Sequence, residues 1–218
     1  MLHPLGRQPS QSCYGMAITT FEGRATCYRC FRPQVGCICD LVHPVDNRTR
    51  VVIVQHPRER KHPFGTVRLA RLGLRNVEVH VASRRGEGTH CPVVAPAGSV
   101  LLYPSPSATP LAELSEAPAA MVVADGTWPS SRALLRDNPW LLELPHVSLA
   151  PTAPGRYRIR KAPRPGFQLS TIEAIVAALQ ELEPETPGLP GLLTAFDAMI
   201  DHQLELTERL GHGPKTGA

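Results

Sequence analysis

The stretch that decides the fold is "AMVVADGTWPSSRALLRDNPW", residues 120–140. Its first six residues form a short apolar run rich in valine, which is typical of a buried strand. Pro129 suits the first turn of a helix, with Thr127 or Trp128 as the cap. The stretch therefore predicts a buried strand that passes directly into a helix.

Similar elements lie on both sides of this unit. Four more stretches are strand-like: 50–55, 77–82, 99–104 and 146–150. Three more are helix-like: 66–74, 170–182 and 191–210. Strands that alternate with helices predict an α/β fold with a largely parallel sheet. The helix at 170–182 opens on Ser170-x-x-Glu173, the pattern of a capping box.

Composition bounds the class of protein. The 218 residues carry a net charge of +4 with 19% charged residues, too few for a disordered chain. The sequence contains no run of about 18 consecutive apolar residues, so it predicts no membrane-spanning helix. The first twenty residues lack the charged and then apolar segments of a signal peptide. We expect a cytoplasmic protein, with a monomer as the favoured state. The expected parts are a flexible tail at 1–22, a zinc-knuckle segment at 23–48 and a catalytic domain at 49–210.

Four of the six cysteines gather in thirteen positions. They are Cys27, Cys30, Cys37 and Cys39. Two close pairs on a short loop can surround one ion, and Zn²⁺ takes four thiolates in closed structural sites. The alternatives are free thiols or disulfides, and a reducing compartment argues against disulfides. Because four protein ligands leave no position for water or substrate, we predict a structural Zn²⁺ rather than a catalytic one.

Cationic residues gather in two places. Arg29 and Arg32 lie among the cysteines, where a fixed knuckle could present them to a phosphate backbone. The second set lies in the long stretch 149–166 and comprises Arg156, Arg158, Arg160, Lys161 and Arg164. Long loops in compact domains are commonly functional or disordered, and this one has the charge to hold phosphate. Solvated surface charge is the alternative interpretation for both sets.

Ligands of open α/β sheets bind beyond the carboxyl ends of the strands. Three stretches are expected there: 55–66, 125–128 and 149–166. Asp125 is a carboxylate at a strand end, which could accept a proton or cap the next helix. Gly126 allows a sharp turn or a close approach of the backbone to a ligand. His56 could be a base or a ligand, although a histidine beside proline is more often structural.

Four motifs, taken in order, resemble one known family. They are "CYRCFRPQVGCIC", "QHPRERKHPFGT", "DGTW" and "STIEAIVAAL". Together they are similar to the DTW-domain proteins, whose signature is Asp-x-Thr-Trp, over about residues 25–205. The resemblance implies a fold similar to SPOUT-type RNA modification enzymes, with a C-terminal trefoil knot around an S-adenosylmethionine site. Such a knot is an exception among proteins.

The resemblance also implies an activity. It is that of a tRNA-uridine aminocarboxypropyltransferase, which moves the 3-amino-3-carboxypropyl group of S-adenosylmethionine to N3 of a uridine in tRNA. The product is acp3U, and methylthioadenosine is released. An RNA methyltransferase of the same fold and a non-enzymatic zinc-knuckle RNA-binding protein are the alternatives.

The resemblance and the strand-end positions suggest roles for single residues. Asp125 is the candidate base for uridine N3, with Thr127 to orient it or cap the helix and Trp128 to pack on adenine or the target base. Core packing is the alternative for Trp128, and the capping box competes for Ser170 and Glu173. The expected cofactor-binding residues are His56, Pro57, Glu59, Thr66, Asp125, Gly126, Thr127, Trp128, Leu149, Ser170, Thr171 and Glu173.

Overall fold

The structure is a computed structural model that describes residues 25–62, 64–86, 88–151, 153–159 and 168–209. A six-stranded sheet with the order β2-β1-β7-β5-β8-β6 forms its centre. The strands are β1 (Arg50–Gln55), β2 (Val77–Val81), β5 (Val100–Leu102), β6 (Thr109–Pro110), β7 (Ala120–Asp125) and β8 (His146–Ser148). Every neighbouring pair is parallel, so the predicted α/β fold with a parallel sheet is confirmed.

The neighbouring interior strands β1 and β7 end together. Gln55 of β1 lies opposite Asp125 of β7 in the register of the sheet. The β1 side chains alternate between two cores: Val51 and Ile53 face one, Val52 and Val54 the other. This alternation is the period of two that a strand imposes. Because both faces of β1 are buried, its residues 51–54 form a continuous apolar run. The run ends at the polar residue Gln55, at the carboxyl end of the strand.

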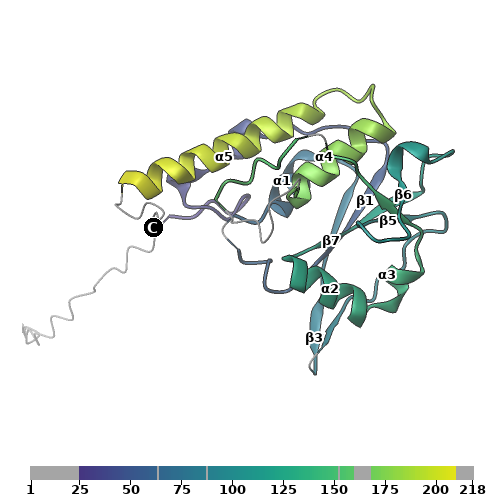
Figure 1. Cartoon of the computed structure of the whole chain (residues 1–218). Helices are drawn as coiled ribbons and strands as arrows, with labels where there is room; N and C mark the ends of the chain where they lie inside the picture. The colour runs from purple at the N-terminus through teal and green to yellow at the C-terminus, as the bar shows by residue number, and fades with distance from the viewer. Residues whose placement is uncertain (1–24, 63, 87, 152, 160–167, 210–218) are drawn as a thin grey trace, which may run out of the picture.

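Helices cover both faces of the sheet (Figure 1). The helices of one face are α1 (Val67–Gly73), α4 (Thr171–Leu182) and α5 (Leu189–Arg209), and those of the other are α2 (Trp128–Asp137) and α3 (Pro139–Glu143). A Cβ atom on Gly73 would lie 2.1 Å from Leu192, so α1 and α5 pack closely at a residue without a side chain. The predicted helix of 127–140 is two helices, because Asn138 precedes a proline and leaves the helical conformation.

The cysteine segment is packed on the larger core. It contains two short 3-10 helices, η1 (Gln34–Gly36) and η2 (Cys39–Leu41). Cys30, Ile38 and Val42 are buried in the same cluster as α1, α4 and α5. The knuckle therefore shares its apolar residues with the helices that cover the sheet.

Some elements lie outside the sequence-based expectations. A two-stranded antiparallel hairpin, β3 (Ser83–Arg85) and β4 (Gly88–His90), follows β2, and the short helix η3 (Leu111–Glu113) follows β6. The hairpin residues are mostly polar and lack an apolar alternation, so periodicity gives no signal for them. Residues 160–167 lie outside the described residues, and the predicted C-terminal trefoil knot stays a prediction. Within the described ranges, no helix combines the length and the apolar character needed to cross a bilayer.

Candidate functional site

Asp125 lies at the end of β7 with both carboxylate oxygens hydrogen-bonded. Gln55 Nε2 donates to one oxygen at 3.0 Å, and Thr171 Oγ1 donates to the other at 2.6 Å. The side chain is only 6% exposed. Both donors are neutral, so they hold the carboxylate in a fixed orientation without neutralising its charge.

The loop after β1 is tied to this site through the backbone. The His56 N–H donates to the carbonyl of Asp125 at 2.9 Å, which extends the pairing of β1 and β7 by one residue. His56 Nδ1 accepts from the Arg58 N–H at 3.3 Å. Burial, and next the charge of Arg58, lower the pKa of His56 below its ordinary value. The imidazole is therefore neutral near pH 7, with Nδ1 as the acceptor and the proton on Nε2.

The turn after β7 begins the next helix. Thr127 is the N-cap of α2, and its hydroxyl accepts from the Ser130 N–H at 3.3 Å. A Cβ atom on Gly126 would lie 2.8 Å from Ser130, so glycine permits the chain to turn tightly into the helix. Trp128 is 39% exposed and meets Tyr103 edge to face, with 6.3 Å between the ring centroids. Trp128 thus leaves indole surface open at the start of α2.

The start of α4 contributes a second buried carboxylate. Glu173 accepts hydrogen bonds from the backbone N–H and the hydroxyl of Ser170, at 2.8 and 2.6 Å, and from the Arg156 N–H at 2.5 Å. The capping box is present. A Cβ atom on Gly155 would lie 2.1 Å from the carbonyl of Gln168, so the two chain segments touch there. Glu173 therefore links Arg156, in the stretch 149–166, to α4. The same helix contributes Thr171, which donates a hydrogen bond to Asp125.

The other four predicted cofactor-binding residues lie in the loops after β1 and β8 and where α1 begins. Glu59 is buried in the loop after β1, Thr66 is buried where α1 begins, and Leu149 is half-buried after β8. Pro57, beside His56, is half-buried. The structure thus gathers the predicted residues at the carboxyl ends of β1, β7 and β8 and at the start of α4, and their cofactor role stays a prediction.

The four cysteines of the knuckle converge on one point. Their sulfur atoms all lie within 4.8 Å of one another, with Cys27 and Cys39 at 3.7 Å and Cys30 and Cys37 at 3.8 Å. Four sulfurs at about 2.3 Å from a tetrahedral Zn²⁺ stand roughly 3.8 Å apart. Backbone N–H groups of Cys30 and Arg29 lower the pKa of Cys27 to about 6. The donor set therefore fits a tetrahedral metal ion.

Arg32 connects this cluster to the loop after β1. It is 4% exposed; its Nε donates to the Gly36 carbonyl at 2.7 Å, and its guanidinium lies 5.5 Å from the centroid of the Phe64 ring. Tyr157 donates from its hydroxyl to the Phe64 carbonyl at 2.7 Å. Burial lowers the pKa of Arg32 below its ordinary value. Arg32 is thus committed to packing between knuckle and loop, whereas Arg29 is exposed.

The predicted basic stretch is partly neutralised. Arg156 forms an ion pair with Asp197, and Arg158 forms one with Asp201, both with α5. The other three cationic residues of that prediction, Arg160, Lys161 and Arg164, lie outside the described residues. RNA binding by this stretch stays a prediction, and two of its charges already have carboxylate partners.

Sequence reasoning missed Gln55 and Tyr157 as supports of the site. Gln55 is a polar residue that ends an apolar strand, and this is the signal that singled out Asp125. Tyr157 anchors the stretch 149–166 by its hydroxyl and by its ring, which lies 5.6 Å from that of Phe196. No spacing pattern in the sequence indicates that anchor.

Comparison with known proteins agrees with the motifs. The chain is 32% identical over 192 residues to tRNA-uridine aminocarboxypropyltransferase 2 of Drosophila melanogaster, covering 84% of this chain and 76% of that protein. It is 31% identical to the Mus musculus protein of the same name, covering 88% and 68%. Identity to tRNA-uridine aminocarboxypropyltransferase A of Arabidopsis thaliana is 24%, covering 88% and 86%. No solved structure matches the chain.

A family model agrees with these relatives. The model described as the DTW domain matches residues 24–204, from the cysteine knuckle to α5. That range holds the four cysteines, the Asp125-Gly126-Thr127-Trp128 turn and the start of α4. The resemblance read from the motifs is confirmed: the chain belongs to the DTW domain family.

Proposed function

We propose that the protein transfers the 3-amino-3-carboxypropyl group of S-adenosylmethionine to N3 of a uridine in tRNA. The observation that carries the proposal is the buried Asp125 carboxylate, which Gln55 and Thr171 hold at the sheet edge where ligands of parallel sheets bind. The names of the relatives support the same activity.

The residues around Asp125 fit such a cofactor. The exposed indole of Trp128 and the half-buried side chain of Leu149 offer apolar surface to a nucleoside. Two buried carboxylates, Asp125 and Glu173, favour a cationic group nearby. When bound, S-adenosylmethionine would supply an electrophilic carbon next to a sulfonium leaving group. Which of the three carbons at the sulfonium reacts depends on which one the protein holds in line with the nucleophile.

Asp125 would act on the proton of uridine N3. A neutral imide nitrogen is a poor nucleophile, and a positioned general base contributes typically ~10²–10⁴-fold. Gln55 and Thr171 would keep the carboxylate oriented, and the backbone bond between His56 and Asp125 would hold the loop after β1 at the same place. Trp128 would stack on the adenine or on the target base.

The four cysteines would bind one Zn²⁺ with no open coordination position. The ion would then contribute folding energy to the knuckle rather than chemistry to the transfer.

The by-product tests the proposal. The purified protein is incubated with S-adenosylmethionine and bulk tRNA, and the released nucleoside is identified by mass spectrometry together with the modified base. Methylthioadenosine with acp3U is the expected result. Release of S-adenosylhomocysteine would instead identify an RNA methyltransferase. If the protein binds tRNA but releases neither product, the result would favour a non-enzymatic RNA-binding protein.

A further inference from the structure

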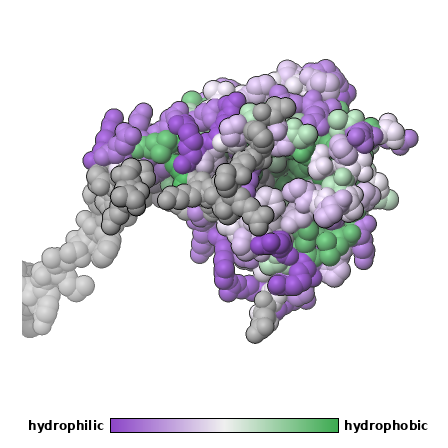
Figure 2. Space-filling model, viewed as in Figure 1, coloured by the Kyte–Doolittle hydropathy of each residue, from purple (hydrophilic) through white to green (hydrophobic). Residues whose placement is uncertain are grey.

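The β3–β4 hairpin presents unpaired positive charge. Arg84 and Arg85 are both exposed, and neither forms an ion pair with any residue that the structure describes. Hydrophilic residues gather at the lower end of the molecule in Figure 2, where Figure 1 shows the hairpin. By contrast, Arg156 and Arg158 of the predicted basic stretch already pair with carboxylates of α5.

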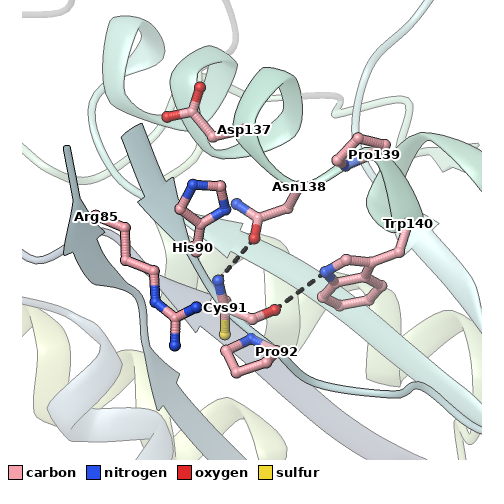
Figure 3. Close-up of a pocket in the computed structure, with 8 residues that line it drawn as sticks. All are labelled: Arg85, His90, Cys91, Pro92, Asp137, Asn138, Pro139 and Trp140. Carbon is pink, nitrogen blue, oxygen red and sulfur yellow. Dashed lines mark hydrogen bonds between the residues drawn. The ribbon is translucent and has the colours of Figure 1, made fainter. Parts of the chain in front are cut away.

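A cavity of about 310 Å³ opens beside this hairpin. Figure 3 shows Arg85 and His90 on one side, Pro139 and Trp140 on the other, and Cys91 and Pro92 between them. His90, Pro92 and Pro139 are exposed, and Trp140 is half-buried. The cavity thus combines an indole and two proline rings with cationic and imidazole groups at its rim.

The polar groups of the cavity floor are satisfied within the protein. Trp140 Nε1 donates to the Cys91 carbonyl at 3.1 Å, and Asn138 Oδ1 accepts from the Cys91 N–H at 2.7 Å. The Asn138 amide donates to the carbonyls of Thr89 and Leu134 at 2.7 and 2.8 Å. Asp137 accepts two bonds from Thr89 and pairs with Arg136. A ligand would therefore meet stacking surface in the floor and free donors only at the rim.

The hairpin and this cavity lie within reach of the Asp125 site. At about 1.5 Å of rise per residue, the nine steps from Trp128 to Asp137, the first and last residues of α2, span roughly 14 Å. Gln55, which donates to Asp125, pairs in the sheet with Val81 at the end of β2, and the hairpin begins two residues later at Ser83. A strand that placed one base at Asp125 could therefore continue along α2 to the cavity.

We propose that the β3–β4 hairpin and the adjoining cavity bind single-stranded nucleotides that flank the target uridine of the tRNA. Arg84 and Arg85 contact phosphates, and a flanking base stacks between the Trp140 indole and the hairpin. Because the floor offers stacking without free hydrogen-bonding groups, recognition there tolerates any base. This inference rests on the proposed function for the identity of the target.

Salt dependence tests the hairpin. The double variant Arg84→Ala, Arg85→Ala should raise KM for tRNA several-fold and leave kcat at saturating tRNA within about twofold. It should also lower the magnitude of the slope of log affinity against log salt by about 1.4, since each of the two lost single-strand phosphate contacts contributes about 0.7. The matched control is Arg71→Ala with Arg75→Ala, which removes two exposed arginines near the amino edge of the sheet, and it should change none of these. Equal slopes for both pairs would overturn the proposal.

Fluorescence tests the cavity apart from any reaction. Trp128→Phe leaves Trp140 as the single tryptophan of the chain. A single-stranded oligouridylate should quench its emission saturably, and a duplex RNA of equal length should quench it much less, because paired bases are not free to stack. The Arg84→Ala, Arg85→Ala background should weaken the quenching. Equal quenching by duplex, or none by single strand, would overturn the stacking site.

These results separate the inference from the proposed function. A wild-type protein that releases methylthioadenosine with tRNA, while the hairpin variant keeps its KM and salt slope, contradicts only the hairpin. If the wild-type protein releases no methylthioadenosine while Trp140 is quenched saturably in the Trp128→Phe variant, only the proposed reaction is contradicted.

Discussion

The cysteine knuckle and the Asp125 site are built in opposite ways. The knuckle brings its four sulfurs together from thirteen consecutive positions, 27–39. The carboxylate of Asp125 is held by one residue 70 positions earlier and another 46 positions later. The comparison teaches that a candidate metal site can be local in the sequence. The proposed catalytic carboxylate on the parallel sheet instead takes its supports from a neighbouring strand and from the start of α4.

The two regions also differ in what they can lose. Asp125 sits among neutral donors that fix its orientation, so a substitution of similar shape can remove the charge and keep the packing. The knuckle contributes Cys30, Ile38 and Val42 to the main core. If the four cysteines bind the predicted Zn²⁺, losing that ion should therefore lower the stability of the whole fold. The predictions below separate catalysis in one region from stability in the other.

Asp125→Asn should give the largest effect on transfer. Asparagine keeps the shape, and its single oxygen can still accept one of the two hydrogen bonds that Gln55 and Thr171 donate to separate carboxylate oxygens. Its NH2 group takes the place of the other oxygen, so the second partner must turn to accept, and the side chain cannot take the N3 proton. We expect single-turnover methylthioadenosine release to fall by about 10²–10⁴-fold, while binding of S-adenosylmethionine and tRNA persists, because the loss is confined to the transition state. A near-wild-type rate would remove Asp125 as the base.

Binding measurements complete this test. If Asp125→Asn also abolishes S-adenosylmethionine binding by calorimetry, Asp125 is a binding residue, and the base lies elsewhere in the loop after β1. Thr171→Val serves as the matched variant, since it removes one donor to the carboxylate and leaves the charge. Its rate should lie between those of wild type and Asp125→Asn.

Metal loss should act on stability first. We expect about one Zn²⁺ per freshly reduced chain by metal analysis. Cys30→Ser should lower the free energy of unfolding by on the order of 4 kcal/mol, the size associated with a lost metal or a broken core. Cys91→Ala, in the other core cluster, should retain the metal. The prediction of a structural zinc would be contradicted if the freshly reduced wild-type chain holds no metal and Cys30→Ser leaves the melting temperature unchanged.

Arg32 tests whether the knuckle supports the loop after β1. Arg32→Ala removes the bond to the Gly36 carbonyl and the contact with Phe64, and an unsatisfied buried carbonyl costs about 1–3 kcal/mol. We also expect weaker S-adenosylmethionine binding, because Phe64 belongs to the expected cofactor loop. Arg29→Ala removes an equal but exposed charge and should change neither quantity. Equal binding for the two variants would show that the loop does not depend on the knuckle.

The same contrast explains what could be predicted. The apolar runs at 50–55 and 120–125 match β1 and β7 residue for residue, because strands buried on both faces leave an unbroken apolar signal. The pairing of Gln55 and Thr171 with Asp125 depends on strand order, which no local pattern encodes. The β3–β4 hairpin has too few buried residues to create a period, and Arg32 reads as a surface charge until its contact with Phe64 is known.

The smallest expected effect concerns Arg158, at the boundary between stability and RNA binding. Its ion pair with Asp201 joins two exposed side chains, so the pair contributes only about 0–1 kcal/mol to stability. If the stretch 149–166 binds phosphate as predicted, Asp201 competes with the RNA for Arg158. Asp201→Asn should then tighten tRNA binding slightly and steepen its salt dependence by up to about 0.7 per released contact, whereas Arg158→Ala should do the opposite.

Thermal melting of both variants should stay near that of the wild type. If neither variant moves the salt slope while the Arg84 and Arg85 variants do, Arg158 is a structural partner of α5, and the RNA contacts lie on the hairpin side.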